Sequence, residues 1–266
     1  MPVTLKPAIV ARTCTYVYAT GLDKEGIHQV HVCGYQNKAR SLDGPNIMFL
    51  NFPGTNLQLV SGPEQTETVM KDITRRLPEL RPDLSKRVGA FSWNIRPEEY
   101  GTYTVVLAEG PEEILPALDQ MPENRRLARS GQLRRAVEAY TSLKPQDSFA
   151  ICCFDGKVKP GFPITVSYTP HNPRVLVAPG WDGLDGTLPM PGRLVRRDAR
   201  VAFAIQGVSS PHAVYYEDEL EYEPWAPQSV CGFVDNRPEG PNSDYVVPVD
   251  MVRAGLTGRA LAATLL

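Results

Sequence analysis

The densest group of side chains that could do chemistry lies in the segment YTPHNPRVLVAPGWDGLDG. It places His171 and Asn172 at a polar corner, and then Trp181, Asp182 and Asp185 among glycines. An imidazole beside a carboxylate can act as a general acid or base, and loops held by a sheet are where binding residues concentrate. We therefore interpret His171, Asp182 and Asp185 as candidate catalytic residues, with Trp181 and Asn172 as candidate substrate contacts.

The two aspartates also have an explanation without function. Asp182 and Asp185 each precede a glycine. Asp-Gly pairs are favoured in turns, because glycine accepts a positive φ and aspartate bonds to its own backbone. The segment is thus either a site on loops or ordinary turn chemistry, and the sequence supports both.

Charged side chains in the first half could anchor a substrate. Arg75, beside Arg76, could hold a substrate carboxylate through paired hydrogen bonds, and Glu98, after Arg96, could contact the substrate or act as a base. The other explanation for Arg75 is solvated charge on a helix flank, which is the usual role of such a residue.

The remaining histidines and cysteines fit a packed core better than a reactive site. His28 and His31 are three apart in an expected strand and so face opposite sides, whereas His31 and Cys33 share a face. Adjacent Cys152 and Cys153 would face opposite sides, and free cysteine is commonly a small buried residue. Without a second pair of ligands these residues predict no metal site.

Several motifs with known chemistry are absent from the sequence. It contains no GxxxxGK[ST], GxGxxG, HExxH, CxxC or GxSxG. Phosphate loops, dinucleotide folds, zinc proteases, thiol-redox sites and serine hydrolases therefore lack support. We expect a protein without an organic cofactor or a bound metal.

Charge and composition argue against two classes of binding partner, nucleic acids and membranes. The 28 Lys and Arg residues are balanced by 30 Asp and Glu residues, so no basic surplus favours nucleic acid. No apolar stretch approaches the roughly 18 residues of a membrane span, and no signal peptide is recognisable. Five cysteines without paired spacings fit a reducing compartment. We expect a soluble cytoplasmic protein that binds neither nucleic acid nor membranes.

Hydrophobic patterning predicts a mixed α+β fold with largely antiparallel sheets and a central helical segment. Strand-like runs occupy the first sixty residues and most of the chain after Ser148. Helical patterns lie between them, near 63–80 and 111–121 and in a long helix from Pro122 to Lys144. The order does not alternate strand and helix regularly, which argues against a doubly wound parallel sheet.

The sequence suggests an N-terminal α+β half, residues 1–145, and a C-terminal β-rich half, residues 146–266; the alternative is one continuous domain. Segments 27–56 and 163–182 share a plan of strand, polar corner, second strand and Pro-Gly. The similarity is explained either by chance or by a duplicated unit.

Two functions from different classes follow. The first is a cytoplasmic enzyme that acts on a small polar or aromatic metabolite by cofactor-independent acid–base chemistry. The second is a non-catalytic binding or assembly protein that forms oligomers through its helices and its C-terminal tail, LAATLL.

Overall fold

The computed structural model describes residues 3–42, 44–60, 63–77, 104–119, 131–155, 163–183, 189–214, 216 and 225–255. Within them the chain is mixed α+β with mostly antiparallel sheets, which confirms the predicted fold class. The strands are β1 (Val3–Thr4), β2 (Ala8–Leu22), β3 (His28–Ser41), β4 (Pro45–Phe52), β5 (Gly54–Leu59), β6 (Thr104–Ala108), β7 (Ser148–Asp155), β8 (Ile164–Pro170), β9 (Val175–Ala178), β10 (Leu194–Val195), β11 (Ala199–Ile205), β12 (His212–Ala213), β13 (Ser229–Asp235), β14 (Gly240–Pro241) and β15 (Tyr245–Pro248). The helices are α1 (Pro63–Arg75), α3 (Pro111–Asp119), α4 (Gly131–Leu143) and α5 (Val249–Arg253).

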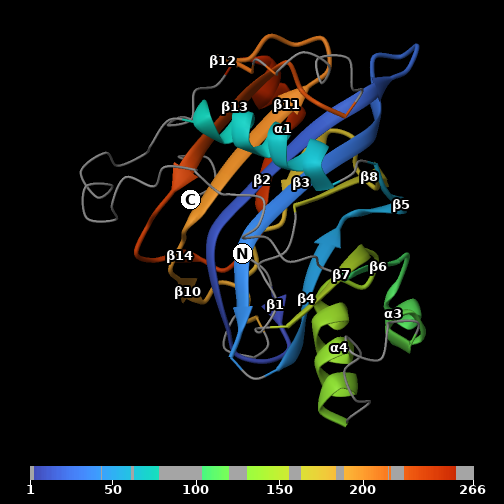
Figure 1. Cartoon of the computed structure of the whole chain (residues 1–266). Helices are drawn as coiled ribbons and strands as arrows, with labels where there is room; N and C mark the ends of the chain where they lie inside the picture. Colours follow the sequence, from blue (N-terminus) through green and yellow to red (C-terminus); the bar gives the residue numbers. More distant parts are fainter. Residues whose placement is uncertain are drawn as a thin grey trace.

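The largest sheet has seven strands in the order β12-β13-β11-β2-β3-β8-β5 (Figure 1). Among its described strands the only parallel pair is β11 with β2, and the other neighbours run antiparallel. A four-stranded sheet has the order β1-β4-β7-β6, and two small ladders join β10 to β14 and β9 to β15. Strands from both sides of residue 145 therefore share the two larger sheets.

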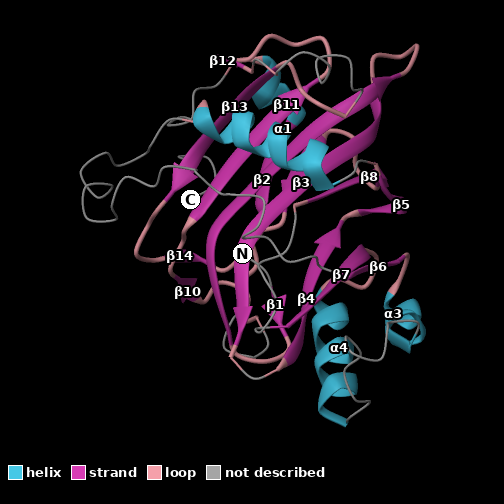
Figure 2. Ribbon diagram, viewed as in Figure 1, coloured by secondary structure: helices cyan, strands magenta, loops and turns pink. Residues whose placement is uncertain are grey.

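The described elements stack as four layers (Figure 2). Helix α1 covers one face of the seven-stranded sheet, where Tyr16 packs in the same buried cluster as Ile73. The opposite face packs against the four-stranded sheet, so that Val17 and Met48 share a second cluster. The outer face of the four-stranded sheet is covered by α3 and α4. The seven-stranded sheet and the four-stranded sheet are thus each covered on both faces, as in other layered domains.

The helices follow the predicted apolar spacing. In α1 the side chains of Val69 and Ile73, four residues apart, are fully buried against the sheet. In α4 the predicted inward positions Leu133, Val137 and Tyr140 are all buried. The predicted start of that helix at Pro122 lies outside the described residues.

The adjacent cysteines confirm the period-two expectation for a strand. Cys152 packs between the two sheets, and Cys153 packs under α3 and α4. All five cysteines are buried and free. Among the elements described, no helix has the length and apolarity needed to cross a membrane.

Candidate functional site

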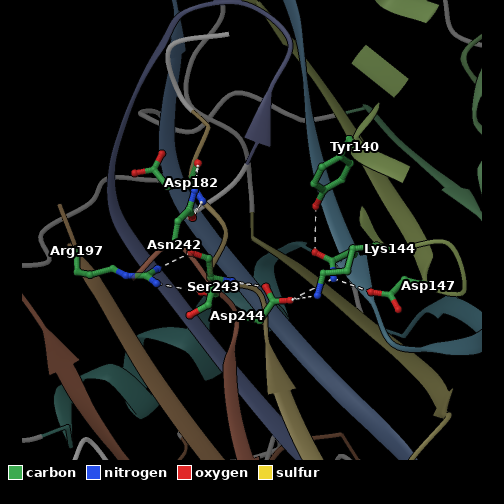
Figure 3. Close-up of polar contacts among 10 residues, drawn as sticks. Tyr140, Lys144, Asp147, Asp182, Arg197, Asn242, Ser243 and Asp244 are labelled. Atoms are coloured by element: carbon green, nitrogen blue, oxygen red, sulfur yellow. Dashed lines mark hydrogen bonds and ion pairs between the residues drawn. The ribbon is translucent and has the colours of Figure 1, made fainter. Parts of the chain in front are cut away.

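A group of polar side chains lies where the four-stranded sheet, α4 and the β14–β15 connection meet. We call it the polar centre and define it as Asn51, Tyr140, Lys144, Asp147 and Asp244. Asn51 lies near the end of β4, Tyr140 is on α4, and Lys144 and Asp147 lie in the turns between α4 and β7. Figure 3 shows the side chains of Tyr140, Lys144, Asp147 and Asp244 turned toward one another.

Hydrogen bonds connect every member of the polar centre. The Tyr140 hydroxyl donates to Asn51 Oδ1 at 3.0 Å. Asn51 Nδ2 donates to Asp147 Oδ2 at 2.7 Å and, more weakly, to Asp244 Oδ2 at 3.4 Å. The amide of Asn51 thereby uses both its acceptor and its donor group inside the fold.

Asp244 is the hub of the network. Its Oδ2 accepts from Lys144 Nζ at 2.7 Å, and its Oδ1 accepts from the backbone N–H of Gly180 at 2.9 Å. The Lys144 ammonium also lies 5.3 Å from the centre of the Trp181 ring, within cation–π range. The Asp244 side chain is only 4% exposed and that of Lys144 is 23% exposed, so this is a largely buried ion pair.

The second carboxylate of the centre, Asp147, is electrostatically perturbed. Burial raises the pKa of Asp147 above its ordinary value, and the neighbouring Asp244 carboxylate raises it further, while Asn51, Lys144 and His171 oppose the shift. A carboxyl with a raised pKa and charged neighbours is a common feature of active sites, although structural networks show it as well.

The structure places the predicted catalytic histidine beside this centre. His171 is exposed, and its Nε2 lies 2.7 Å from the carbonyl oxygen of Gln146, the residue before Asp147. Its backbone N–H donates to the carbonyl of Pro53. Among its contacts in the described chain there is no hydrogen bond to Asp182, and the acid that it influences electrostatically is Asp147.

The predicted catalytic aspartate, Asp182, belongs to a neighbouring backbone clamp. Its N–H donates to Asn242 Oδ1, and its carbonyl accepts from Asn242 Nδ2, both at 2.7 Å. In Figure 3 Asp182 and Asn242 lie on one side of Asp244, and Tyr140, Lys144 and Asp147 lie on the other. The other candidate acid, Asp185, lies outside the described residues.

A buried arginine completes the clamp. The guanidinium of Arg197 donates to the carbonyl oxygens of Gly180, Pro241 and Ser243, and it lies 5.2 Å from the centre of the Tyr245 ring. Arg197 is 2% exposed, and its charge is balanced by carbonyl dipoles and an aromatic face. The loop that carries Trp181 is therefore held by hydrogen bonds between its backbone and the side chains of Arg197 and Asn242.

The predicted substrate contacts also have structural partners. Trp181 is buried in the cluster under α3 and α4, Asn172 accepts the N–H of Arg174 within a turn, and Arg75 pairs with Asp72 on its own helix. In the described chain the His171 ring makes no hydrogen bond to Asn172 or Arg75, while Trp181 lies against Lys144 of the polar centre. The candidate contact Glu98 lies outside the part of the chain that the structure describes.

The cysteines offer no activated thiol. Burial raises the pKa of Cys231 to about 11 and that of Cys33 to about 12. A thiol nucleophile needs the opposite shift, because the thiolate is the reactive form. Within the described chain no three His, Cys, Asp or Glu side chains are placed to hold a metal ion.

Sequence reasoning did not identify Asn51, Lys144, Asp147 or Asp244. The only local signal is that Lys144 and Asp147 flank a predicted end of a helix, where charged residues are common. What unites them is contact between residues almost 200 positions apart, such as Asn51 with Asp244.

No protein-family model and no curated protein matches the sequence. Among solved structures the chain is similar to baculovirus P35, with a TM-score of 0.44 and 17% identity over 74% of this chain and 64% of that one. A mutated baculovirus P35 after caspase cleavage gives 0.39 and 16%, over 73% and 65%. The caspase-8/P35 complex gives 0.35 and 14%, over 73% and 63%. The chain thus spans less than two thirds of these proteins, and similarity at this level assigns no function.

Proposed function

We propose that this chain is a non-catalytic binding or assembly protein. The observation that carries the proposal is how the polar centre uses its groups. The hydrogen bonds of Asn51, Lys144 and Asp244 join a sheet, the end of a helix and two loops to one another. Catalytic groups must instead reach a reacting atom within hydrogen-bond distance or through one water.

The outer side of α4 supports recognition of another protein. Arg134 and Arg135 are exposed, whereas Leu133 and Val137 of the same helix face inward. In the described part of the chain neither arginine has an ion-pair partner. Arginine is enriched at protein interfaces, so this face fits an acidic surface on another protein or on a second copy. Five free thiols fit the reducing cytoplasm as its compartment.

Native mass spectrometry combined with light scattering tests this proposal. We expect a complex, either of several copies or with a protein partner, whose mass falls to that of the monomer when Arg134→Glu and Arg135→Glu are introduced together. His171→Ala should leave that complex intact and serves as the matched control. A monomer that carries a stoichiometric small molecule, lost in His171→Ala, would contradict the proposal.

One observation favours a second function. Asp147, with its raised pKa, lies within electrostatic range of the exposed imidazole of His171. Together they could exchange a proton with a small polar or aromatic metabolite without a cofactor, and Lys144 could neutralise a developing negative charge. In this alternative the acid that works with His171 is Asp147.

The same mass measurement separates the two functions. If the protein is an acid–base enzyme, a small ligand should be retained by Asp182→Asn and lost in both His171→Ala and Asp147→Asn. If the ligand survives Asp147→Asn, the acid–base assignment to Asp147 is wrong.

A further inference from the structure

The seven-stranded sheet contains a histidine that is completely enclosed. His31 on β3 is 0% exposed and faces the core between the two large sheets, on the same side as Cys33. Within the described chain neither ring nitrogen has a hydrogen-bond partner. A buried polar group without a partner is uncommon, because each one costs free energy on folding.

The residue opposite His31 on the neighbouring strand also has a buried polar group without a hydrogen-bond partner among the described residues. Tyr168 of β8 lies directly opposite His31 in the antiparallel register, and the two rings meet edge to face with centroids 5.7 Å apart. The Tyr168 hydroxyl is buried and makes no hydrogen bond to the described residues. The strands pair here through their backbones, and the contact between the two side chains is ring packing.

The neighbours of the ring act on its charge in opposite directions. His28 on the same strand is also buried, with Nδ1 unpartnered, and it lies near Arg253 of α5 and Asp23 of the β2–β3 turn. The Pro173 carbonyl lies close enough to favour a protonated His31, but it is not within hydrogen-bond geometry of the ring. The Asp147 and Asp244 carboxylates act on the neighbouring Tyr168 side chain, but neither makes a hydrogen bond to the His31 ring.

We propose that His31 is an acid-sensing residue, and that its protonation loosens the pairing of β3 with β8 and the turn at residues 171–174. A charged imidazole in this position would lack an anionic partner. A buried charge without a partner is strongly unfavourable, so the strands around it open to admit water. The turn at 171–174 carries both His171 and the Pro173 carbonyl, and it would move with β8.

The direction of the effect follows from linkage. Burial, together with the charge of His28, lowers the pKa of His31 from 6.5 to about 4. Above pH 6.5 the ring is neutral in both the folded and the unfolded chain, so it does not affect stability. Between pH 6.5 and about 4 the unfolded chain takes up the proton first, and the folding equilibrium constant falls by roughly 80-fold over this range.

Two measurements test the proposal. Ring NMR of the wild-type protein should show His31 still neutral at pH 5, well below the ordinary histidine pKa of 6.5. Urea unfolding should show a loss of stability between pH 6.5 and 4.5 that is smaller in His31→Leu than in the wild type and is retained in His171→Gln. The proposal is overturned if the His31 ring titrates near pH 6.5, or if His31→Leu keeps the full loss. The NMR measurement decides the matter even if His31→Leu does not fold.

Discussion

Lys144 Nζ lies 2.7 Å from Asp244 Oδ2 and above the ring of Trp181, so one ammonium group joins the end of α4 to the β14–β15 connection. The same carboxylate holds the N–H of Gly180 through its other oxygen. Asp244 therefore ties the outer helical layer to the loops beside the seven-stranded sheet. Long-range contacts of this kind fix the relative position of layers that share few backbone hydrogen bonds.

The Asp147→Asn substitution should change how stability depends on pH. Burial raises the pKa of Asp147 above its ordinary value of 3.8, so the protonated form favours folding. The wild type should lose this contribution as the pH rises through the raised pKa, while Asp147→Asn should not. Urea unfolding at pH 4 and pH 7 should show the variant gaining on the wild type at the higher pH.

Asp235→Asn provides a control of opposite sign. Burial raises the pKa of Asp235, but hydrogen bonds from Arg237 outweigh it, and the pKa is lowered overall. Asp235→Asn should therefore lose stability relative to the wild type as the pH rises from 2 to 5. Identical pH profiles for the two variants would contradict both assignments.

The cysteines should be inert in the folded protein. All five thiols are buried, and burial raises the pKa of Cys33 to about 12 and that of Cys231 to about 11. Because the thiolate is the reactive form, Ellman's reagent should label fewer than one thiol per chain at pH 8 before unfolding, and five in denaturant. Rapid labelling of one native thiol would reveal an accessible, activated cysteine.

Gly34→Ala should be strongly destabilising. Gly34 on β3 lies opposite Tyr16 on β2, and an added Cβ would fall 2.0 Å from Cε1 of the Tyr16 ring. Overpacking of a fully buried ring costs about 1–3 kcal/mol or more of the unfolding free energy. Gly131→Ala is a matched control, because its Cβ would make only an ordinary contact with Arg135 at 3.6 Å. Because Gly131 is the first residue of α4, we expect a change of less than about 0.5 kcal/mol in unfolding free energy, and equal effects at both sites would contradict the packing argument.

Arg197→Lys should disrupt the clamp although it conserves the charge. The planar guanidinium reaches three carbonyl oxygens, whereas a lysine ammonium cannot reproduce this geometry. We expect a loss of about 2–3 kcal/mol in unfolding free energy, since buried carbonyls lose their donors. Arg75→Ala, which removes an exposed helix pair, should cost less than about 1 kcal/mol in the same urea experiment.

Patterning along the sequence was sufficient for much of the fold. The alternation of side chains along a strand correctly placed Cys152 and Cys153 on opposite faces of the sheet. The spacing of apolar residues correctly identified the buried face of α4. These predictions succeeded because the side-chain period within one element is set by local backbone geometry. Short ladders such as β9 with β15 were not predicted, since their pairing depends on which segments meet in space.

The polar centre illustrates what sequence patterns could not provide. His171 attracted attention because an imidazole among loop aspartates suggests acid–base chemistry, yet the acid beside it is Asp147, some 24 residues earlier. Asp182 lies closer in sequence, but its backbone is engaged with Asn242. The sequence gives no sign of Asp147 because the turn after β8 folds back onto Pro53 and Gln146, which precede it by more than twenty residues.

A double-mutant cycle between Lys144 and Asp244 tests most directly whether the charged groups of the polar centre hold the layers together. The variants are Lys144→Met, Asp244→Asn and their combination, compared by urea unfolding at pH 7. Each single change should cost about 3–5 kcal/mol, because it leaves one buried charge without its partner. If the ion pair holds the layers together, the coupling energy between Lys144 and Asp244 should be at least about 1 kcal/mol. Strictly additive effects would contradict it.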